Sequence, residues 1–225
     1  SMLTLHHLEY SQSFRVLWLL EELGVDYELR IYERDTETYQ APPELKKLSP
    51  LGSAPVITDD KVILAESSAI IDYILDAHPD SGLRVSPDSG DRVRYLFWMH
   101  ASQGSMMSLM LMEAVFQILI SRVPFLIRPI IKAILKQASL NLIKPRMTSL
   151  LNIAEADLQL SKYFAGDRLT TADIAMIYPM AAAKDRFYLD VDYPECNDWL
   201  DRVQQSESFK SAAAKDGRDS IVLRV

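Results

Sequence analysis

Apolar positions in the first eighty residues follow two spacings, one typical of strands and one typical of helices. Leu3 and Leu5 are separated by a polar residue, and the same alternation recurs over residues 27–32, so each segment predicts a strand. Residues 14–23 are apolar at helical spacing and are followed by Gly24, a residue that commonly ends helices. The chain therefore opens with a predicted β-α-β unit.

Four more elements follow in the same region. Pro42 and Pro43 predict the start of a short helix, because proline is favoured in the first turn. Apolar runs at 56–58 and 62–64 flank a polar turn and predict a β-hairpin. A serine at 67 or 68 caps a helix that runs to about residue 77. The resulting order, β-α-β-α-β-β-α, is typical of a thioredoxin-like domain.

The remainder of the chain predicts helices, and no strand signal of comparable strength appears in it. Residues 78–91 are rich in proline, glycine and serine and predict a linker. We therefore expect an α/β thioredoxin-like N-terminal domain over residues 2–80, a linker over 81–91 and an all-α C-terminal domain over 92–225. Helical periodicity covers residues 93–112, 114–121, 126–143, 147–163, 171–183 and 195–205.

Composition narrows the class of protein without deciding it. The 225 residues are 48% apolar and 24% charged, as in an ordinary soluble globular protein. A net charge of −7 argues against nucleic acid as a partner, since phosphate binding needs a basic surface. The single cysteine, Cys196, argues against a disulfide framework or a metal site and favours a reducing, cytoplasmic location. The uncharged run 95–112 is too polar for a membrane span and predicts a buried helix.

Three polar clusters stand at the starts of helices or strands in the predicted α/β domain. Residues 11–15 (SQSFR) open the first helix, residues 53–56 (SAPV) open a strand, and Glu66-Ser67 opens another helix. Unpaired backbone N–H groups and a polar side chain meet at each place, so each can hold part of an anionic ligand. Together, in this order, they indicate a site for a small peptide.

Four segments resemble the glutathione S-transferase family, and the resemblance extends over essentially the whole chain. Residues 11–24 (SQSFRVLWLLEELG) resemble the first helix of the serine-type enzymes. Residues 41–52 (APPELKKLSPLG) are similar to the Gtt subgroup of fungi and bacteria. Residues 65–70 (AESSAI) match the family's Glu-Ser signature, and residues 164–175 (FAGDRLTTADIA) resemble its helix-capping segment. The four matches occur in the family's order, which makes the resemblance specific.

The resemblance implies a function, partners and a location. We expect a cytoplasmic, homodimeric detoxification enzyme that conjugates the glutathione thiolate to hydrophobic electrophiles, with glutathione peroxidase activity as a side reaction. Glutathione is then a co-substrate, and no cofactor, metal, nucleic acid or membrane is expected. The alternative is a non-catalytic, transferase-like protein that binds apolar ligands or partners.

By resemblance, Ser11 is the catalytic residue and also contacts glutathione. The thiolate is the nucleophile, and a free thiol has a pKa of about 8.5. A hydroxyl that donates to the sulfur at a helix N-terminus stabilises the thiolate. The alternative role for Ser11 is a helix cap, although Ser13 fits that role better. Tyr10 is a rival hydroxyl, but the tyrosine used by other branches lies earlier on the first strand.

The resemblance assigns the other glutathione contacts to Ser53, Ala54, Glu66 and Ser67. Pro55 is expected to follow a cis peptide bond, which turns the backbone of Ala54 toward the cysteinyl part of glutathione. Glu66 then faces the γ-glutamyl ammonium, and Ser67 holds the γ-glutamyl carboxylate. For Ser67, a simple N-cap role is compatible with this assignment.

Ser53 departs from the family pattern. Related Gtt-like chains often carry a basic residue at this position, where it can contact the glycyl carboxylate. Either glutathione binds less tightly here, or the contact comes from Lys46, Lys47 or Gln40.

The electrophile pocket is assigned by position to Met107, Met110, Phe116 and Tyr178. Four methionines fall within residues 106–112 on one predicted helix, and methionine adapts to varied ligand shapes. A methionine stripe fits an ordinary core equally well.

Residues 122–146 contain six basic residues and no acidic one. Arg128, Lys132 and Lys136 recur every four residues among apolar ones, a pattern that can lie on a membrane surface. The interpretation that we favour is a helix packed on its own domain with a solvated basic face. Covering the electrophile site is a further alternative.

Two remaining features predict structural roles. Thr170 and Asp173 are spaced as a capping box, in which each side chain binds the backbone of the other. Cys196 lies far from every motif above and is expected to be a buried or idle thiol.

Overall fold

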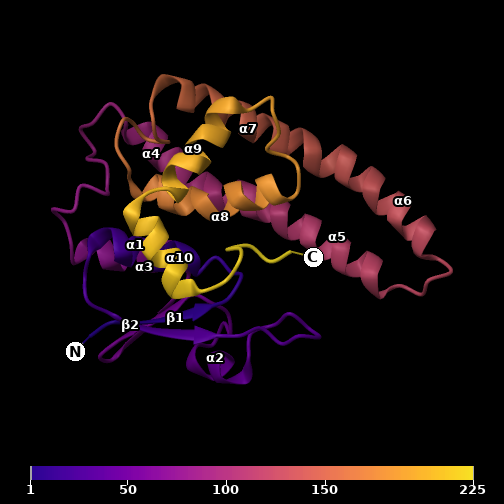
Figure 1. Ribbon diagram of the computed structural model, residues 1–225, viewed down its shortest axis with the longest axis horizontal. Coiled ribbons are helices and arrows are strands. Elements are labelled where there is room, and N and C mark those ends of the chain that lie inside the picture. Colours follow the sequence, from indigo (N-terminus) through magenta and orange to yellow (C-terminus); the bar gives the residue numbers. More distant parts are fainter. Residues whose placement is uncertain (1, 225) are drawn as a thin grey trace.

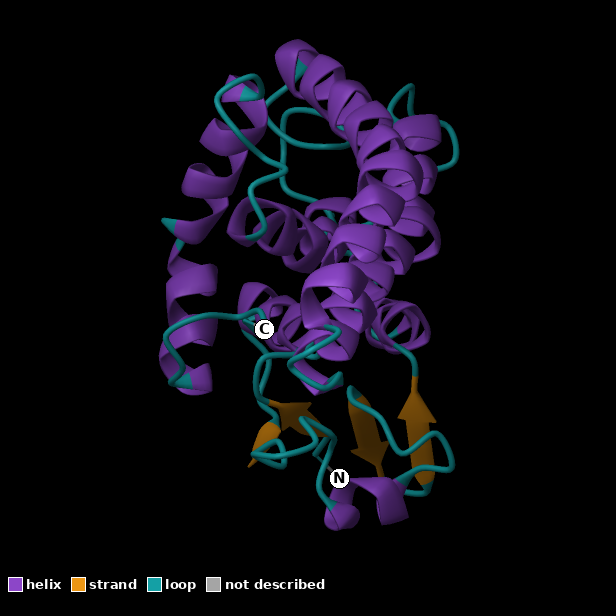
Figure 2. Ribbon diagram, turned by 90° about the vertical axis from the view of Figure 1, so that its right-hand side faces the viewer, coloured by secondary structure: helices purple, strands orange, loops and turns teal. Residues whose placement is uncertain are grey.

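A computed structural model describes residues 2–224, in which a small sheet lies below a larger set of helices (Figures 1 and 2). The strands β1 (Thr4–Leu8), β2 (Glu28–Tyr32), β3 (Val56–Asp59) and β4 (Val62–Ala65) form one sheet in the order β2-β1-β3-β4. Strand β1 is parallel to β2 and antiparallel to β3, and β3 pairs antiparallel with β4. The predicted thioredoxin-like order of elements is confirmed.

Helix α1 (Phe14–Leu23) is the central element of the molecule. Its residues 14–20 are all buried, because the helix packs against the sheet on one side and against helices of the second half on the other. Gly24 ends it in a left-handed conformation, with φ of 65°, as its sequence position predicts. Helices α2 (Pro43–Leu48) and α3 (Ser67–Asp76) complete this part.

The second half is helical, but with fewer breaks than its sequence predicts. A single helical run joins α4 (Arg92–Ala101), a π-helical turn η1 (Ser102–Met107) and α5 (Ser108–Arg122). The predicted break at residue 113 is wrong, because the Glu113 carboxylate is accommodated by hydroxyl donors from Ser139 and Tyr188. A second run joins α6 (Arg128–Ala138), η2 (Ser139–Ile143) and α7 (Lys144–Leu160). Pro145 does not interrupt it, since a first-turn proline removes no hydrogen bond that α7 needs.

Helices α5 and α6 form an arm that extends away from the rest of the molecule (Figure 1). Every residue of α6 is at least partly exposed, and Phe125 and Leu126 at the tip are 74% and 76% exposed. Helix α6 packs against α5 of its own domain, and Arg128, Lys132 and Lys136 are exposed, as the favoured interpretation of this basic segment predicts. The run Arg92–Arg122 is long and apolar enough to cross a membrane, and 17% of its most apolar window is buried. The predicted buried helix is thus buried along one face, which includes Trp98, Met106 and Met110, while Phe97 and Leu111 on the other side are exposed.

Helix α8 (Thr171–Asp185) is almost entirely buried and is followed by α9 (Pro194–Gln204) and α10 (Glu207–Asp216). The predicted capping box is present, with Thr170 and Asp173 bonded to each other's backbone. Helix α10 is an element that the sequence pattern missed. It packs along α1, where Phe209 contacts the rings of Phe14 and Trp18 (Figure 1). Two residues could have predicted this helix, the N-cap Ser206 and Gly217, which ends it.

Candidate functional site

A cavity of about 570 Å³ lies between the sheet part and the helical part. It brings together Ser11, Ser53 and Ala54 from the first part with residues of α5 and α8 from the second. Of the candidate pocket residues, Met107, Met110 and Tyr178 line it. Within residues 2–224, its lining does not include Glu66, Ser67 or Phe116. Phe116 packs instead against the hydrophobic core.

Ser11 lies in the turn between β1 and α1 and is 6% exposed, at the wall of the cavity. Its Oγ lies 2.7 Å from the carbonyl oxygen of Leu8 and 2.6 Å from the Oγ of Ser13. The backbone N–H of Ser13 donates to the same oxygen at 3.2 Å. These contacts fix the hydroxyl at the N-terminal end of α1, where the helix dipole favours an anion.

The role expected for Ser13 is wrong. Ser13 stands at the N-cap position of α1, but its side chain makes no capping hydrogen bond there. Its Oγ instead accepts from the backbone N–H of Leu8 at 3.0 Å and lies 2.6 Å from Nδ1 of His7. The side chain is fully buried and supports Ser11 from behind.

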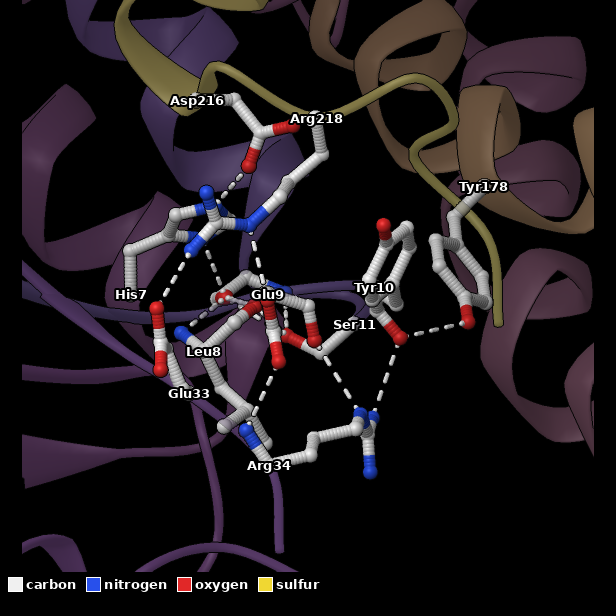
Figure 3. Close-up of polar contacts among 11 residues, drawn as sticks. His7, Leu8, Glu9, Tyr10, Ser11, Glu33, Arg34, Tyr178, Asp216 and Arg218 are labelled. Carbon is white, nitrogen blue, oxygen red and sulfur yellow. Dashed lines mark hydrogen bonds and ion pairs between the residues drawn. The ribbon is translucent and has the colours of Figure 1, made fainter. Parts of the chain in front are cut away.

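Tyr10, the rival hydroxyl, points away from the cavity. Its hydroxyl donates to Asp219 at 3.0 Å, and its φ of 51° is left-handed. Its carbonyl oxygen accepts from Arg34 at 3.0 Å and from the Tyr178 hydroxyl at 3.3 Å (Figure 3). Tyr10 therefore ties the β1–α1 turn to α8 and to the segment after β2.

The peptide bond between Ala54 and Pro55 is cis, as the family resemblance implies. Ala54 lines the cavity immediately before β3, whose first residue is Val56. The backbone of Ala54 thus stands at the edge of the cavity, on the same side as Ser11.

Known proteins carry the same two parts in the same order. Residues 11–77 match the family model for the N-terminal domain of glutathione S-transferases, and residues 111–207 match the model for the C-terminal domain. Glutathione S-transferase 3 of Schizosaccharomyces pombe is 31% identical over 99% of this chain and 91% of its own length. The chain belongs to the glutathione S-transferase family.

Two further similarities agree with this assignment. Glutathione S-transferase 1 of Saccharomyces cerevisiae is 31% identical over 95% of each chain. The crystal structure of a glutathione S-transferase from Actinobacillus pleuropneumoniae is 32% identical and has a TM-score of 0.76, covering 96% of this chain and 93% of its own. The chain is thus a glutathione transferase with the two-part fold of the family.

In this transferase, Glu66 and Ser67 lie at the start of α3. Glu66 has a φ of 76°, a conformation that non-glycine residues hold mainly where the surrounding structure imposes it. Ser67 is buried at the first residue of the helix, where backbone N–H groups have no partner within the helix. The negative charge of Glu66 also raises the pKa of Arg15, the basic residue of α1.

Arg15 is completely buried and has a role that the sequence did not reveal. Burial lowers the pKa of its guanidinium to about 10, although the nearby Tyr178 and Glu66 oppose this shift. The guanidinium donates to the side-chain oxygens of Gln12 and Gln103, the latter at 3.0 Å. Both glutamines line the cavity, and Gln103 lies in the π-helical turn η1. Arg15 therefore orients polar groups from both halves of the molecule at one cavity wall.

Two of the three candidates to replace the basic residue missing at Ser53 line the cavity. Lys46 and Gln40 both do so, and the Lys46 ammonium donates to the Gln40 carboxamide oxygen at 2.9 Å. Lys47 is exposed and, within the described residues, lies outside the lining. The Lys46 side chain also lies beside Gly52, the residue before Ser53.

The opposite side of the cavity is apolar. Met107 and Met110 are joined there by exposed or half-buried residues of α5, and by Tyr178, which is 8% exposed. Arg186 closes one end, where its guanidinium donates to the Met110 carbonyl oxygen at 2.6 Å. Besides Met110, the apolar α5 residues in this wall are Leu111, Ala114 and Ile118.

Other reactive groups of the described chain stand apart from the cavity. Cys196 is buried in α9, and burial, with the nearby Glu155 carboxylate, raises the pKa of its thiol far above its ordinary value. His100 is exposed on α4. Within residues 2–224, no group of three His, Cys, Asp or Glu side chains is arranged to hold a metal ion.

Proposed function

We propose that Ser11 of this glutathione transferase donates a hydrogen bond to the sulfur of glutathione and so stabilises the nucleophilic thiolate. The observation that carries the proposal is a buried hydroxyl at the wall of a cavity that is polar on one side and apolar on the other. A hydrogen bond to the charged form of a group lowers its pKa when the group is an acid. The thiolate then attacks a hydrophobic electrophile, and glutathione peroxidase activity is a side reaction of the same thiolate.

Glutathione would lie along the wall formed by the first part of the chain. The backbone of Ala54 pairs with the cysteinyl unit, and Ser53 flanks it. Glu66 and Ser67 hold the γ-glutamyl end, for which the unpaired N–H groups at the start of α3 give support. The glycyl carboxylate extends toward Lys46, whose ammonium group stands in the same wall.

The electrophile would occupy the apolar side of the cavity. Met107, Met110 and Tyr178 form this side with the exposed face of α5, and methionine side chains adapt to ligands of different shape. Phe116 is left out of this set because it packs into the core.

Conjugation of 1-chloro-2,4-dinitrobenzene tests the proposal. We expect activity in the wild type and a loss of about tenfold to a hundredfold in kcat/KM for Ser11→Ala, because a hydrogen bond to a charged group contributes about 1.5–3 kcal/mol. Ser11→Cys is the matched control that keeps a small donor at this position. Tight binding of apolar dyes without activity in either protein would favour the non-catalytic alternative.

We also propose a cytoplasmic, homodimeric detoxification enzyme with a glutathione-binding domain over residues 2–80, a linker over 81–91 and a substrate domain over 92–225. Family membership supports these assignments. Light scattering should give a mass near twice 25.6 kDa, and a mass of one chain would contradict the dimer.

A further inference from the structure

A chain of short polar contacts runs from Ser11 into the interior and ends on the C-terminal helix. The Oγ atoms of Ser11 and Ser13 are 2.6 Å apart, and Ser13 Oγ lies 2.6 Å from Nδ1 of His7. Nε2 of His7 lies 2.5 Å from Oδ1 of Asp216. Ser13, His7 and Asp216 are each at most 3% exposed, so only the Ser11 end meets the cavity. Figure 3 shows Asp216 reaching His7 from the segment at the end of α10.

The number of protons in this chain decides which way the serine hydroxyls point. When His7 donates from Nε2 to the Asp216 carboxylate and is neutral, its Nδ1 has a lone pair and accepts the Ser13 hydroxyl proton. The contact between the serines then requires the Ser11 proton, so Ser11 has none to offer to a ligand. In this state the chain is ready to receive a proton at Ser11.

One more proton reverses the two links that involve the serines. With Nδ1 protonated, His7 donates to Ser13 and Ser13 donates to Ser11. The Ser11 proton then has two possible acceptors, the Leu8 carbonyl oxygen at 2.7 Å and a thiolate in the cavity, and the charged acceptor is the stronger one. The imidazolium then forms a buried ion pair with the Asp216 carboxylate. The two states therefore differ by one proton, and they present Ser11 first as an acceptor and then as a donor.

We propose that the Asp216–His7 pair accepts the thiol proton of bound glutathione through Ser13 and Ser11. The S–H bond breaks and its proton passes to Ser11 Oγ, the Ser11 proton passes to Ser13 Oγ, and the Ser13 proton passes to Nδ1 of His7. The products are a thiolate that accepts a hydrogen bond from Ser11 and an imidazolium paired with Asp216. No proton leaves the protein, and His7 and Asp216 act through the serines without touching substrate.

Other charged side chains lie near the His7–Asp216 pair. Arg218, just beyond α10, is ion-paired with Glu9 at 2.7 Å and with Glu33 at 3.4 Å (Figure 3). The hydrogen bond that Arg218 donates to Glu9 is the largest cause that raises the pKa of Arg218, and the Asp216 charge adds to it. Arg218 is thus a cation near Asp216 whose charge is largely offset by two other carboxylates. The Asp216 carboxylate remains the direct partner of His7.

The inference rests on the proposed function, and proton counting separates the two. Glutathione is mixed with enzyme in weakly buffered solution, and the thiolate is followed by its ultraviolet absorbance while released protons are followed with an indicator. S-methylglutathione, which has no thiol proton, gives the protons released by binding alone. For the wild type we expect thiolate to form with far less than one proton released for each thiolate, after this correction.

Three variants test which residues receive the proton. In His7→Asn, which keeps an amide near Nδ1 but no base, we expect roughly tenfold less thiolate at neutral pH. Each thiolate that still forms should release a full proton. Asp216→Asn should likewise lower the amount of thiolate and raise the number of protons released for each thiolate. Ser211→Ala removes another hydrogen bond between α10 and α1, from Ser211 to Glu21, and should leave both quantities unchanged.

Two results would overturn the inference. If wild-type enzyme forms thiolate and releases a full proton for each one, the thiol proton goes to solvent and the transfer to His7 is refuted, while the role of Ser11 stands. If wild-type enzyme forms no thiolate at all, the proposed function fails and the inference fails with it. The wild-type measurement needs no variant to fold.

Discussion

Asp173 is the buried carboxylate on which the capping box of α8 depends. It is fully buried and accepts three hydrogen bonds from N–H donors, at 3.0 Å from Phe164, 3.0 Å from Thr170 and 2.8 Å from the Trp199 indole. Replacement by alanine leaves these donors buried without a partner, at a cost of about 1–3 kcal/mol each. Removal of a desolvated charge offsets part of this cost, so we expect Asp173→Ala to lower the free energy of unfolding by about 3–5 kcal/mol.

Urea unfolding of the wild type, Asp173→Ala and Asp173→Asn measures this loss of stability. Asp173→Asn is the graded control, because one amide oxygen can still accept from Phe164 and Trp199, which share Oδ1, while the amide nitrogen faces the Thr170 N–H. We expect a loss of about 1–3 kcal/mol for this variant. Equal losses for both variants, or losses below about 1 kcal/mol, would refute the claim that the hydrogen bonds accepted by Asp173 stabilise the fold.

The same carboxylate predicts a pH dependence of stability. Burial raises the pKa of Asp173 to about 6 in the folded protein, from 3.8. The native state therefore binds more protons than the unfolded state between these values. Ionisation of this carboxyl group thus reduces the stability of the fold above pH 6, and the reduction is absent below about pH 4. The difference corresponds to about 3 kcal/mol. Wild type should thus gain stability relative to Asp173→Asn as the pH falls from 7 to 4, and a constant difference would contradict this.

Three smaller predictions concern the cavity and the lone thiol. Lys46→Ala should raise KM for glutathione about two- to fivefold with kcat unchanged. Lys47 lies outside the cavity lining, so Lys47→Ala should leave KM unaltered. Equal effects of the two substitutions would refute a contact between Lys46 and the glycyl carboxylate. Leu111→Ser should raise KM for the electrophile but not for glutathione, with Leu119→Ser on the same helix as the control, in steady-state assays that vary each substrate. Cys196 should react with a thiol reagent at least roughly tenfold faster in urea than in the native protein, because burial raises its pKa.

The order of elements could be predicted because its signals are local. The alternation in β1 and β2, the apolar run of α1 and the Thr170–Asp173 box each lie within a few residues, and each is present in the structure. The resemblance to the family also placed Pro55 after a cis bond. Such features depend on neighbours in the chain, which a sequence displays directly.

Features that depend on distant contacts were missed or misjudged. Ser13 looked like a helix cap because its true partner, His7, lies on the preceding strand and is held by Asp216, 209 residues further along. Arg15 draws Gln103 across the interface between the two parts. Helix α10 has a weak apolar pattern because α1 covers only a narrow stripe of it. Likewise, the amphipathic pattern of α6 could not tell whether its apolar face is covered.

The central claim is that Ser11 holds the sulfur of glutathione as a thiolate, and the pKa of the enzyme-bound thiol tests it most directly. Ultraviolet titration of the complex gives this pKa for the wild type and for Ser11→Ala. We predict a wild-type value well below the ordinary value of about 8.5 and a rise of about one to two pH units in the variant. The same pKa in both proteins would contradict the account.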